Sequence, residues 1–431
     1  MTTWQNWAGN QAMSPTQVAH PSGAGEIAAV VKEAASAGRR VKAIGSGHSF
    51  TGIGLTDGVL LQLDRHTALI AADTDTGLVT VESGMPLHEL NATLVEHGLG
   101  LTNMGDIDVQ TVAGAISTGT HGTGRTSGSI AQQVAALELV LADGSVVSCS
   151  RTERPELFEM ARIGLGALGV VSTVTFQAEP MFALTADERP MPLDDVLDGF
   201  EELVADNEHF EFYWFPHTRL ALTKRNNRST ELKPLSRRRA WIDDELLSNG
   251  LFGATCRVGA LMPRVIPSIN KVAARALSAR TYTDVAPHVF TSPRRVRFCE
   301  MEYAIPRAEL PAVFRELTTL PERIGERVSF PVECRVAPAD DIPLSTAGGR
   351  DSAYIAVHVF RGTSFDRYFN AVEALMGTVG GRPHWGKLHT LDAAALRERY
   401  PRFDDFVALR RSLDPEGTFR NGYLDRVLGP I

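Results

Sequence analysis

Apolar and polar positions in residues 13–180 follow two alternating periodicities. Short β-branched runs at 41–44 and 78–82 are typical of strands, because every second side chain can then be buried. Residues 27–37 and 87–97 instead place apolar side chains three and four positions apart, which is typical of helices with one buried face. The pattern therefore predicts a first block of mixed strands and helices.

A hairpin and a long strand close this block. The segments 137–141 and 145–148 flank Asp143-Gly144, a pair suited to a tight hairpin turn. Residues 170–176 read Val-Val-Ser-Thr-Val-Thr-Phe, and this β-branched run predicts the last strand of the block.

The sequence changes character after Pro180. Aromatic and mixed segments appear, and the ranges 210–215, 297–303 and 352–360 have the composition of strands. A chain of 431 residues is too long for one simple core, so two domains are expected. Residues 181–431 therefore predict a second, α+β domain.

Charge is unevenly placed along the second half. Two basic clusters, Lys224–Arg228 and Arg237–Arg239, lie in polar, unpatterned surroundings and predict solvated loops or surface patches. Steering of a substrate is the alternative interpretation. The chain as a whole has a net charge of −8, which argues against non-specific binding to nucleic acid and against a generally membrane-attracted surface.

The remaining composition is that of an ordinary soluble globular protein, with 43% hydrophobic and 22% charged residues. Cysteines 149, 256, 299 and 334 are scattered without a C-x-x-C pair, so neither a zinc site nor a disulfide framework is expected. Residues 1–5 lack the basic and apolar regions of a signal peptide, and no apolar run is long enough to span a bilayer. We predict a cytoplasmic protein without a metal.

The first candidate for chemistry is Gly45-Ser46-Gly47-His48-Ser49, directly after the predicted strand 41–44. The glycines let backbone N–H groups approach a phosphate, the serines add hydroxyl donors, and His48 places a nucleophilic imidazole at the mouth of the loop. No G-x-x-G follows and no acidic residue is suitably placed, so a nicotinamide-dinucleotide site is disfavoured. Taken alone, His48 also fits a purely structural role.

A second small-residue stretch, Thr111–Gly124, favours the phosphate interpretation. Small and hydroxyl side chains dominate it, and His121 is its only charge-capable group. Its backbone N–H groups can meet a diphosphate without steric obstruction. A tightly packed helix of small residues followed by a loop is the alternative. Two such stretches in one α/β block favour a single diphosphate ligand shared between them.

Two polar clusters in the second half are candidates for catalysis. Glu333 and Arg335 are two positions apart, so a strand would project both from one face, where they suit hydroxyl recognition or proton removal. In the segment Arg382–Lys387, Lys387 lies beside Trp and His384 and suits a fixed cation near developing negative charge. The alternatives are a surface ion pair of little energetic value and a turn with an interfacial Trp.

The order of these motifs resembles that of the FAD-linked sugar-1,4-lactone oxidoreductases of the vanillyl-alcohol oxidase superfamily. The chain runs from a strand through GSGHS, TVAGAISTGTHGTG, LGALGVVSTVTF, E-x-R and RPHWGK to FRNGYL. L-gulono-1,4-lactone and D-arabinono-1,4-lactone oxidases or dehydrogenases belong to this family, and alditol oxidases are close relatives. The resemblance covers nearly the whole chain.

The resemblance implies an α+β fold in two parts. Residues 13–180 would form an FAD-binding domain of the p-cresol methylhydroxylase (PCMH) type, made of two small α/β subdomains. Residues 181–431 would form an α+β cap or substrate domain. Its last segment, about 380–431, would return to the flavin.

The resemblance also assigns the cofactor residues. In relatives with histidine at the position of His48, the ring is bonded to the 8α-methyl carbon of FAD, so His48 is the expected covalent anchor. A neutral imidazole nitrogen can add to that carbon when it becomes electrophilic. The other expected FAD-binding residues are Gly45, Ser46, Gly47, Ser49, Phe50, Gly105, Asp106, Gly114, Ser117, Gly119, Thr120, Gly122, Gly169, Val171 and Lys387.

The implied activity is hydride transfer from a carbinol carbon of a sugar lactone to flavin N5. For L-gulono-1,4-lactone that carbon is C2, and the product would tautomerise to ascorbate. Glu333 and Arg335 would orient and deprotonate the substrate hydroxyls, Lys387 would stabilise charge near the flavin or substrate, and His384 would be a second contact.

The electron acceptor and the substrate class leave alternatives open. Gly105 aligns approximately with the position that gates oxygen in the family, and a small residue there favours an oxidase that uses O₂ and releases hydrogen peroxide. Asp106 replaces the serine common in alditol oxidases, which weakens the alternative of a xylitol or sorbitol oxidase. A dehydrogenase with another acceptor, and a flavin-binding protein without turnover, are the remaining alternatives; Glu333, Arg335, His384 and Lys387 together speak against the last.

Overall fold

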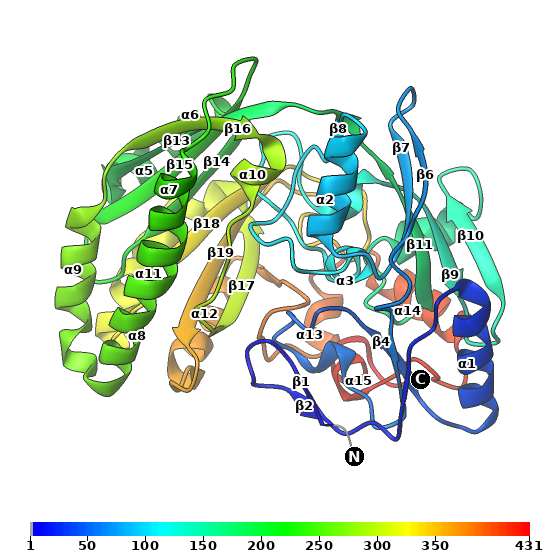
Figure 1. Cartoon of the computed structure of the whole chain (residues 1–431). Helices are drawn as coiled ribbons and strands as arrows, with labels where there is room; N and C mark the ends of the chain where they lie inside the picture. Colours follow the sequence, from blue (N-terminus) through cyan, green and yellow to red (C-terminus); the bar gives the residue numbers. More distant parts are fainter. Residues whose placement is uncertain (1–2) are drawn as a thin grey trace.

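The computed structural model describes residues 3–431, and its sheets divide near residue 180 (Figure 1). The sheets on the right of Figure 1 come from the amino-terminal part, and the single large sheet on the left begins after it. The fold is the expected mixture of helices and strands. The boundaries 13–180 and 181–431 stay predictions, although the change of sheet falls at the same place.

The amino-terminal part begins with a parallel sheet in the order β3-β5-β4. Helix α1 (Ala24–Ser36) packs Ile27 and Val31 into a core shared with Val41 and Val59 of this sheet, as its predicted apolar face requires. The strands are β3 (Gln17–Ala19), β4 (Val41–Ile44) and β5 (Val59–Gln62). Strand β4 therefore leads straight into the Gly45–Ser49 loop.

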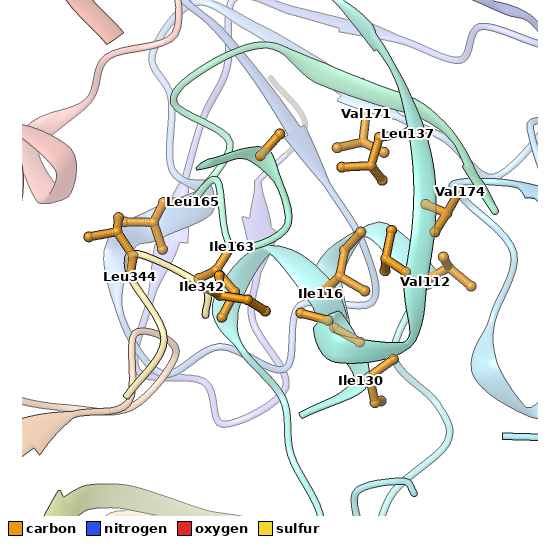
Figure 2. Packing of buried hydrophobic residues seen from close by; sticks show 14 of the residues in the cluster. Val112, Ile116, Ile130, Leu137, Ile163, Leu165, Val171, Val174, Ile342 and Leu344 are labelled. Atoms are coloured by element: carbon orange, nitrogen blue, oxygen red, sulfur yellow. The ribbon is translucent and has the colours of Figure 1, made fainter. Parts of the chain in front are cut away.

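A second, antiparallel sheet has the order β10-β9-β11-β7-β6. The predicted hairpin is confirmed, because β9 pairs with β10 and Gly144 has a φ of 80° at the turn. Figure 2 shows Val112 and Ile116 of helix α3 packed beside Leu137 and Val174 of this sheet. The strands are β6 (Leu69–Asp73), β7 (Leu78–Glu82), β9 (Val134–Val140), β10 (Val146–Ser150) and β11 (Val170–Gln177), with helices α2 (Leu87–Glu96), α3 (Val112–Thr118) and α4 (Pro155–Ala161).

The second part contains one large antiparallel sheet in the order β16-β13-β15-β14-β18-β19-β17-β20. Helices α5 (Leu193–Asp198), α6 (Phe200–Ala205), α11 (Leu310–Ile324) and α12 (Asp366–Gly377) belong to this part. The strands are β13 (Ala183–Pro192), β14 (His209–Trp214), β15 (Leu220–Ser229), β16 (Arg280–Val285), β17 (Phe298–Pro306), β18 (Val332–Ala337), β19 (Ser352–Phe360) and β20 (Arg382–Pro383).

The two faces of this large sheet differ in chemistry. Successive side chains of a strand point to opposite faces. Phe212, Met301 and Cys334 lie in the apolar core that the sheet forms with its helices. Their neighbours Glu302 and Glu333 belong to the opposite face, which lines a cavity. One face of the sheet therefore packs in the core, and the opposite face lines the cavity.

One sequence prediction about this part is wrong. Residues Lys224–Arg228 were expected in a solvated loop or surface patch, but they belong to strand β15, which pairs with β13 and β14. Acidic neighbours make this possible: Lys224 lies 3.6 Å from Glu211, and Arg228 contacts Glu179 at 2.7 Å. The other basic cluster is solvent-exposed as expected, but it forms helix α7 (Arg237–Trp241) rather than a loop.

Helices precede and follow β16 between β15 and β17, and others lie near the carboxyl terminus. After α7 the chain forms a π-helical segment (Ile242–Leu251), α8 (Phe252–Leu261), α9 (Ile266–Ala276) and α10 (Ala286–Phe290). The last helices are α13 (Ala393–Arg397), α14 (Phe403–Leu413) and α15 (Gly422–Leu428). Among the described helices, none has the length and apolarity needed to cross a membrane.

The carboxyl-terminal segment returns to the amino-terminal part. The backbone N–H of Val41 donates to the carbonyl of Thr418 at 2.8 Å. The amide of Asn421 donates to the carbonyls of Ile53 and Leu55, each at 2.9 Å. This return lies beside strand β4, and therefore beside the Gly45–Ser49 loop.

Candidate active site

The Gly45–Ser49 loop is a cradle of free backbone donors. Gly47 has a φ of +72°, a conformation that favours glycine. A Cβ at Gly45 would lie 2.1 Å from the Thr111 hydroxyl, so the loop also needs glycine where it meets α3. Within the described chain, the N–H groups of residues 46–49 have no hydrogen-bond acceptor. Consecutive unpaired N–H groups of this kind bind anions.

Residues before position 13 pack against this cradle, which the sequence analysis missed. The Trp7 ring stacks on His48, with ring centroids 5.3 Å apart and planes 23° apart. The backbone N–H of Trp7 donates to the Gly47 carbonyl at 2.9 Å, and the side-chain amide of Asn6 donates to the Ser49 carbonyl at 3.0 Å. The pair Trp4 and Trp7 near the amino terminus was the available signal.

Helix α3 faces the same cradle. The Thr111 hydroxyl accepts a hydrogen bond from the Gly114 N–H and caps the helix, and Gly119 ends it with a φ of 76°. The stretch is therefore a helix of small residues followed by a loop, and the helix also contributes to a cavity. Gly114, Ser117 and Gly169 line that cavity with the 45–49 loop.

This first cavity is partly open to solvent, and its space amounts to about 1080 Å³. Most of the expected diphosphate and adenine residues line it: Gly45, Ser46, Gly47, His48, Ser49, Gly114, Ser117, Gly169 and Val171. Gly119 and Gly122 are not among its lining residues or those of the second cavity. Packing explains both glycines, because an added Cβ would lie 3.2 Å from Ile163 at Gly119 and 2.1 Å from the Met104 carbonyl at Gly122.

A second cavity of about 1440 Å³ adjoins the first, and the two share His48, Ser49, Gln110 and Thr118. It lies between the loops of the amino-terminal part and the polar face of the large sheet. The other expected site residues line it: Phe50, Gly105, Asp106, Thr120, Glu333, Arg335, His384 and Lys387. One elongated ligand could therefore occupy both cavities.

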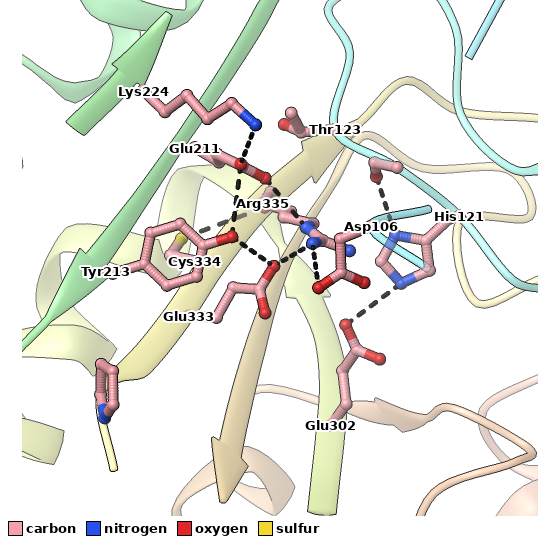
Figure 3. Close-up of polar contacts among 12 residues, drawn as sticks. Asp106, His121, Thr123, Glu211, Tyr213, Lys224, Glu302, Glu333, Cys334 and Arg335 are labelled. Atoms are coloured by element: carbon pink, nitrogen blue, oxygen red, sulfur yellow. Dashed lines mark hydrogen bonds and ion pairs between the residues drawn. The ribbon is translucent and has the colours of Figure 1, made fainter. Parts of the chain in front are cut away.

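Arg335 is the centre of a buried charge cluster on this cavity (Figure 3). Its guanidinium contacts the carboxylate of Glu333, donates from Nε to Glu211 at 3.0 Å, and lies 3.5 Å from Asp106. Strand β18 projects Glu333 and Arg335 from one face, as predicted, and each is only 7% exposed. The alternative of a surface ion pair is therefore wrong.

This cluster gives its carboxylates different proton affinities. Burial, with the nearby carboxylates of Asp106 and Glu211, raises the pKa of Glu333 to about 7 despite the contact with Arg335. Burial also opposes ionisation of Asp106, but Arg335 and Arg294 outweigh it and hold the pKa of Asp106 well below its usual range. Glu333 is thus the carboxylate suited to exchange a proton near neutral pH.

A second charge cluster surrounds Lys387. Its ammonium group contacts Glu300, whose other oxygen lies 3.5 Å from His358. Burial opposes the charge on Lys387, but Glu300 and Glu302 outweigh it and raise its pKa. Burial lowers the pKa of His384 to about 4, so this imidazole is neutral at neutral pH. The cluster supplies a fixed cation beside a neutral ring.

Sequence reasoning missed several residues of these clusters. Glu300 and Glu302 share one face of β17, and Glu302 lies 3.2 Å from His121. Their i, i+2 spacing in a predicted strand was the same signal that identified Glu333. Arg294 carried no such signal, because long-range packing brings it to the cavity, and Glu211 on β14 reaches the site only through its contact with Arg335.

His48 is the nucleophile candidate between the two cavities. Burial, and then the charge of Lys387, lowers its pKa to about 4, which keeps the imidazole neutral. No described residue forms a hydrogen bond with its ring nitrogens; its ring contact is the stacking with Trp7. A neutral, unbonded imidazole at this point can add to an electrophilic carbon.

These features fit FAD. The loop donors suit a diphosphate, and the buried Oε1 of Gln110, which lines both cavities, has no hydrogen-bond partner among the described residues. The second cavity, which adjoins them, is lined by Glu333, whose pKa is about 7, and by fixed cations. Fold and site together define a two-domain FAD-dependent oxidoreductase.

Comparisons with known proteins agree with this class. Residues 174–427 match the model of the D-arabinono-1,4-lactone oxidase family, and residues 15–150 match that of an FAD-binding domain. The chain belongs to the D-arabinono-1,4-lactone oxidase family.

Relatives extend over the full length of the chain. An L-gulono-1,4-lactone dehydrogenase of Mycobacterium tuberculosis H37Rv is 43% identical, with 99% of each chain covered. The L-gulonolactone oxidase of Bos taurus is 34% identical over 98% of each chain, and an alditol oxidase of Streptomyces is 33% identical over 99% of each. A solved cholesterol oxidase of Brevibacterium sterolicum has a TM-score of 0.84 at 19% identity, covering 99% of this chain and 96% of that one, and shows the same fold.

Proposed function

We propose that this protein oxidises a sugar-1,4-lactone of the L-gulono-1,4-lactone or D-arabinono-1,4-lactone type at a carbinol carbon. The observation that supports this most is the buried Glu333–Arg335 pair, which faces a cavity adjoining the diphosphate cradle. The lactone-oxidising relatives support the substrate class. When bound, FAD supplies the two-electron chemistry by accepting a hydride at N5.

Residues of the second cavity would bind the substrate, accept its proton and stabilise charge. Glu333 takes the proton of the reacting hydroxyl, because its raised pKa makes it a base near neutral pH. Arg335 orients hydroxyl groups, and Glu211 and Asp106 fix its guanidinium from other sides. Lys387 stabilises negative charge on the reduced cofactor or the substrate, and His384 gives a neutral contact beside it.

The amino-terminal part would hold the cofactor. The N–H groups of residues 46–49 would bind the diphosphate, with Gly114 and Ser117 of α3 opposite them and Gly169 and Val171 further along the first cavity. The proposal extends to Gly119 and Gly122 only as residues that shape this region. The domain limits 13–180 and 181–431 are part of the same proposal.

We further propose that His48 is bonded through a ring nitrogen to the 8α-methyl carbon of FAD. Bond formation replaces a C–H bond by a C–N bond, which is a two-electron oxidation; protons leave to solvent and the electrons leave with the acceptor of the enzyme. The neutral, unbonded imidazole supports this. Flavin should remain with the protein after acid precipitation, and His48→Ala should release it; complete loss of flavin from the wild type would contradict the tether.

O₂ is the proposed electron acceptor, with hydrogen peroxide as product. Gly105 supports this, because it lines the second cavity and leaves space where a side chain would stand. A Cβ there would lie 3.1 Å from the Thr120 methyl group and 3.4 Å from the His121 carbonyl.

The four cysteines are free and buried, which agrees with the proposed cytoplasmic location.

A substrate panel under anaerobic conditions tests the function. L-gulono-1,4-lactone, D-arabinono-1,4-lactone and xylitol are added in turn, and bleaching of the flavin absorbance is recorded before air is admitted. Bleaching by a lactone and rapid recovery in air are expected. Bleaching by xylitol alone would identify an alditol oxidase, slow recovery in air but fast recovery with cytochrome c would identify a dehydrogenase, and no bleaching would identify a flavin-binding protein without turnover.

A further inference from the structure

The helical segment that follows α7 exposes large apolar side chains and buries several polar ones. Helices of globular proteins bury their apolar face and expose polar residues. Here the buried positions include the polar residues Asp243, Asn249 and Asn270 beside Ile266 and Ala274. The exposed positions of the same segment include leucine, valine and methionine. These exposed apolar side chains have no cover within the described part of the chain, so they are available to contact another molecule or surface.

The exposed apolar side chains form a stripe on α8 and continue onto α9. Leu251, Ala254, Val258 and Leu261 are spaced three and four residues apart, so they share one side of α8. Leu261 is 83% exposed and Val272 on α9 is 67% exposed. Helices α8 and α9 lie at the outer edge of the molecule, on the left of Figure 1. We call this surface, residues 251–275, the α8–α9 face.

Basic side chains accompany the apolar stripe. Arg257 is adjacent to Val258 in the sequence, and Lys271 is adjacent to Val272. These two, with Arg264 and Arg275, are exposed and form no ion pair with any described residue. Lysine and arginine outnumber aspartate and glutamate along residues 230–280, although the whole chain carries −8. The α8–α9 face therefore carries positive charge, although the protein as a whole is negatively charged.

A second copy of the chain fits this face poorly. A symmetric contact would bring the same unpaired basic side chains of both copies, Arg257 and Arg264 among them, into one interface, which is unfavourable. The stripe on α8 is also shorter than the three to four heptads that are typical of a coiled coil between two copies. Apolar side chains flanked by unpaired arginine and lysine are instead the features of a helix that lies on an anionic membrane surface.

We propose that the α8–α9 face docks on a lipid surface that carries anionic headgroups. Leu251, Val258 and Leu261 enter the acyl boundary, and Arg264 and Arg275 meet the headgroups. Ser248 and Phe252 line the second cavity from the inner side of the same helical segment. The docked face is therefore the outer surface of one wall of the active-site cavity.

Vesicle sedimentation with the purified holoenzyme tests the proposal. Phosphatidylcholine vesicles are compared with vesicles that contain about 30% phosphatidylglycerol, at low and at high salt. The wild type should sediment with the anionic vesicles at low salt and remain in solution with phosphatidylcholine alone. Leu261→Glu with Val272→Glu should weaken binding at least about tenfold, and Arg264→Ala with Arg275→Ala should weaken it roughly fivefold per arginine.

Controls separate docking from folding and from self-association. Ile70→Glu, at a residue 54% exposed on β6, should bind vesicles like the wild type. Both double variants should retain wild-type turnover with a soluble dye as acceptor, since neither alters a residue that lines the two cavities of the candidate active site. Wild-type protein that stays in solution with anionic vesicles, or glutamate variants that still sediment, would overturn the proposal. A dimer that these glutamates dissociate, seen by light scattering, would assign the face to a second copy and also overturn it.

Discussion

The two adjoining cavities are built in opposite ways. The first is a cradle made from backbone groups of short, local segments: the Gly45–Ser49 loop and helix α3. The second is made from charged side chains on strands far apart in sequence, such as Glu300 on β17 and Glu333 on β18. The backbone cradle of the first cavity should be sensitive to changes in shape. The side-chain cluster of the second cavity should be sensitive to changes in charge. Variants in the two cavities should therefore fail differently.

The largest effect is expected in the side-chain cavity. Glu333→Gln keeps the shape but cannot accept a proton, so the rate of flavin reduction by substrate should fall about 10²- to 10⁴-fold. Anaerobic stopped-flow absorbance measures this, with flavin content as a folding check. The exposed residue Glu309 gives the matched control, and Glu309→Gln should reduce flavin at the wild-type rate. Near wild-type reduction by Glu333→Gln would remove Glu333 from the mechanism.

The next effect is expected in the cradle. Gly45→Ala would place a Cβ 2.1 Å from the Thr111 hydroxyl, so it should lower the free energy of unfolding by about 1–3 kcal/mol and reduce flavin content. Thermal unfolding and the ratio of flavin to protein absorbance measure the two effects. Gly25→Ala, where no atom lies within 4 Å, is the control and should leave both quantities near wild type. Normal flavin content in Gly45→Ala would show that the close approach is not needed.

A smaller effect concerns the electron acceptor. Gly105→Ala adds a methyl group 3.1 Å from Thr120 in the second cavity, so reoxidation of the reduced enzyme by O₂ should slow by a factor of several while reduction by substrate changes less. Double-mixing stopped-flow separates the two half-reactions. Equal slowing of both would indicate a general distortion of the cavity rather than obstruction of O₂.

The smallest effect is a shift in pH dependence. Glu333 acts as a base in its ionised form, so kcat/KM should rise with pH through about 7 and fall on the acid side of that value. Asp106 raises the pKa of Glu333, so Asp106→Asn should move this acid limb to lower pH. A variant of the cradle such as Ser46→Ala should leave the limb in place. If the acid limb of Asp106→Asn stays at the wild-type pH, the charge of Asp106 does not affect the pKa of Glu333.

Much of this picture followed from local sequence. The strand before the loop, the hairpin at Asp143-Gly144 and the shared face of Glu333 and Arg335 depend on backbone periodicity and turn chemistry, which neighbouring residues determine. The strand at Lys224–Arg228 was missed for the opposite reason. Its charges are neutralised by Glu179, Glu208 and Glu211, and these partners are brought to it by the fold.

By itself, the sequence determined where donors and small residues stand in the cradle, because glycine conformations and i, i+2 spacing are local properties. The tertiary structure alone decided that His48 is stacked on Trp7 and neutral, and that Glu333 has a pKa of about 7. It also decided that Leu251, Val258 and Leu261 face outward. Desolvation and charge coupling act between residues distant in sequence, so they exist only once the chain has folded.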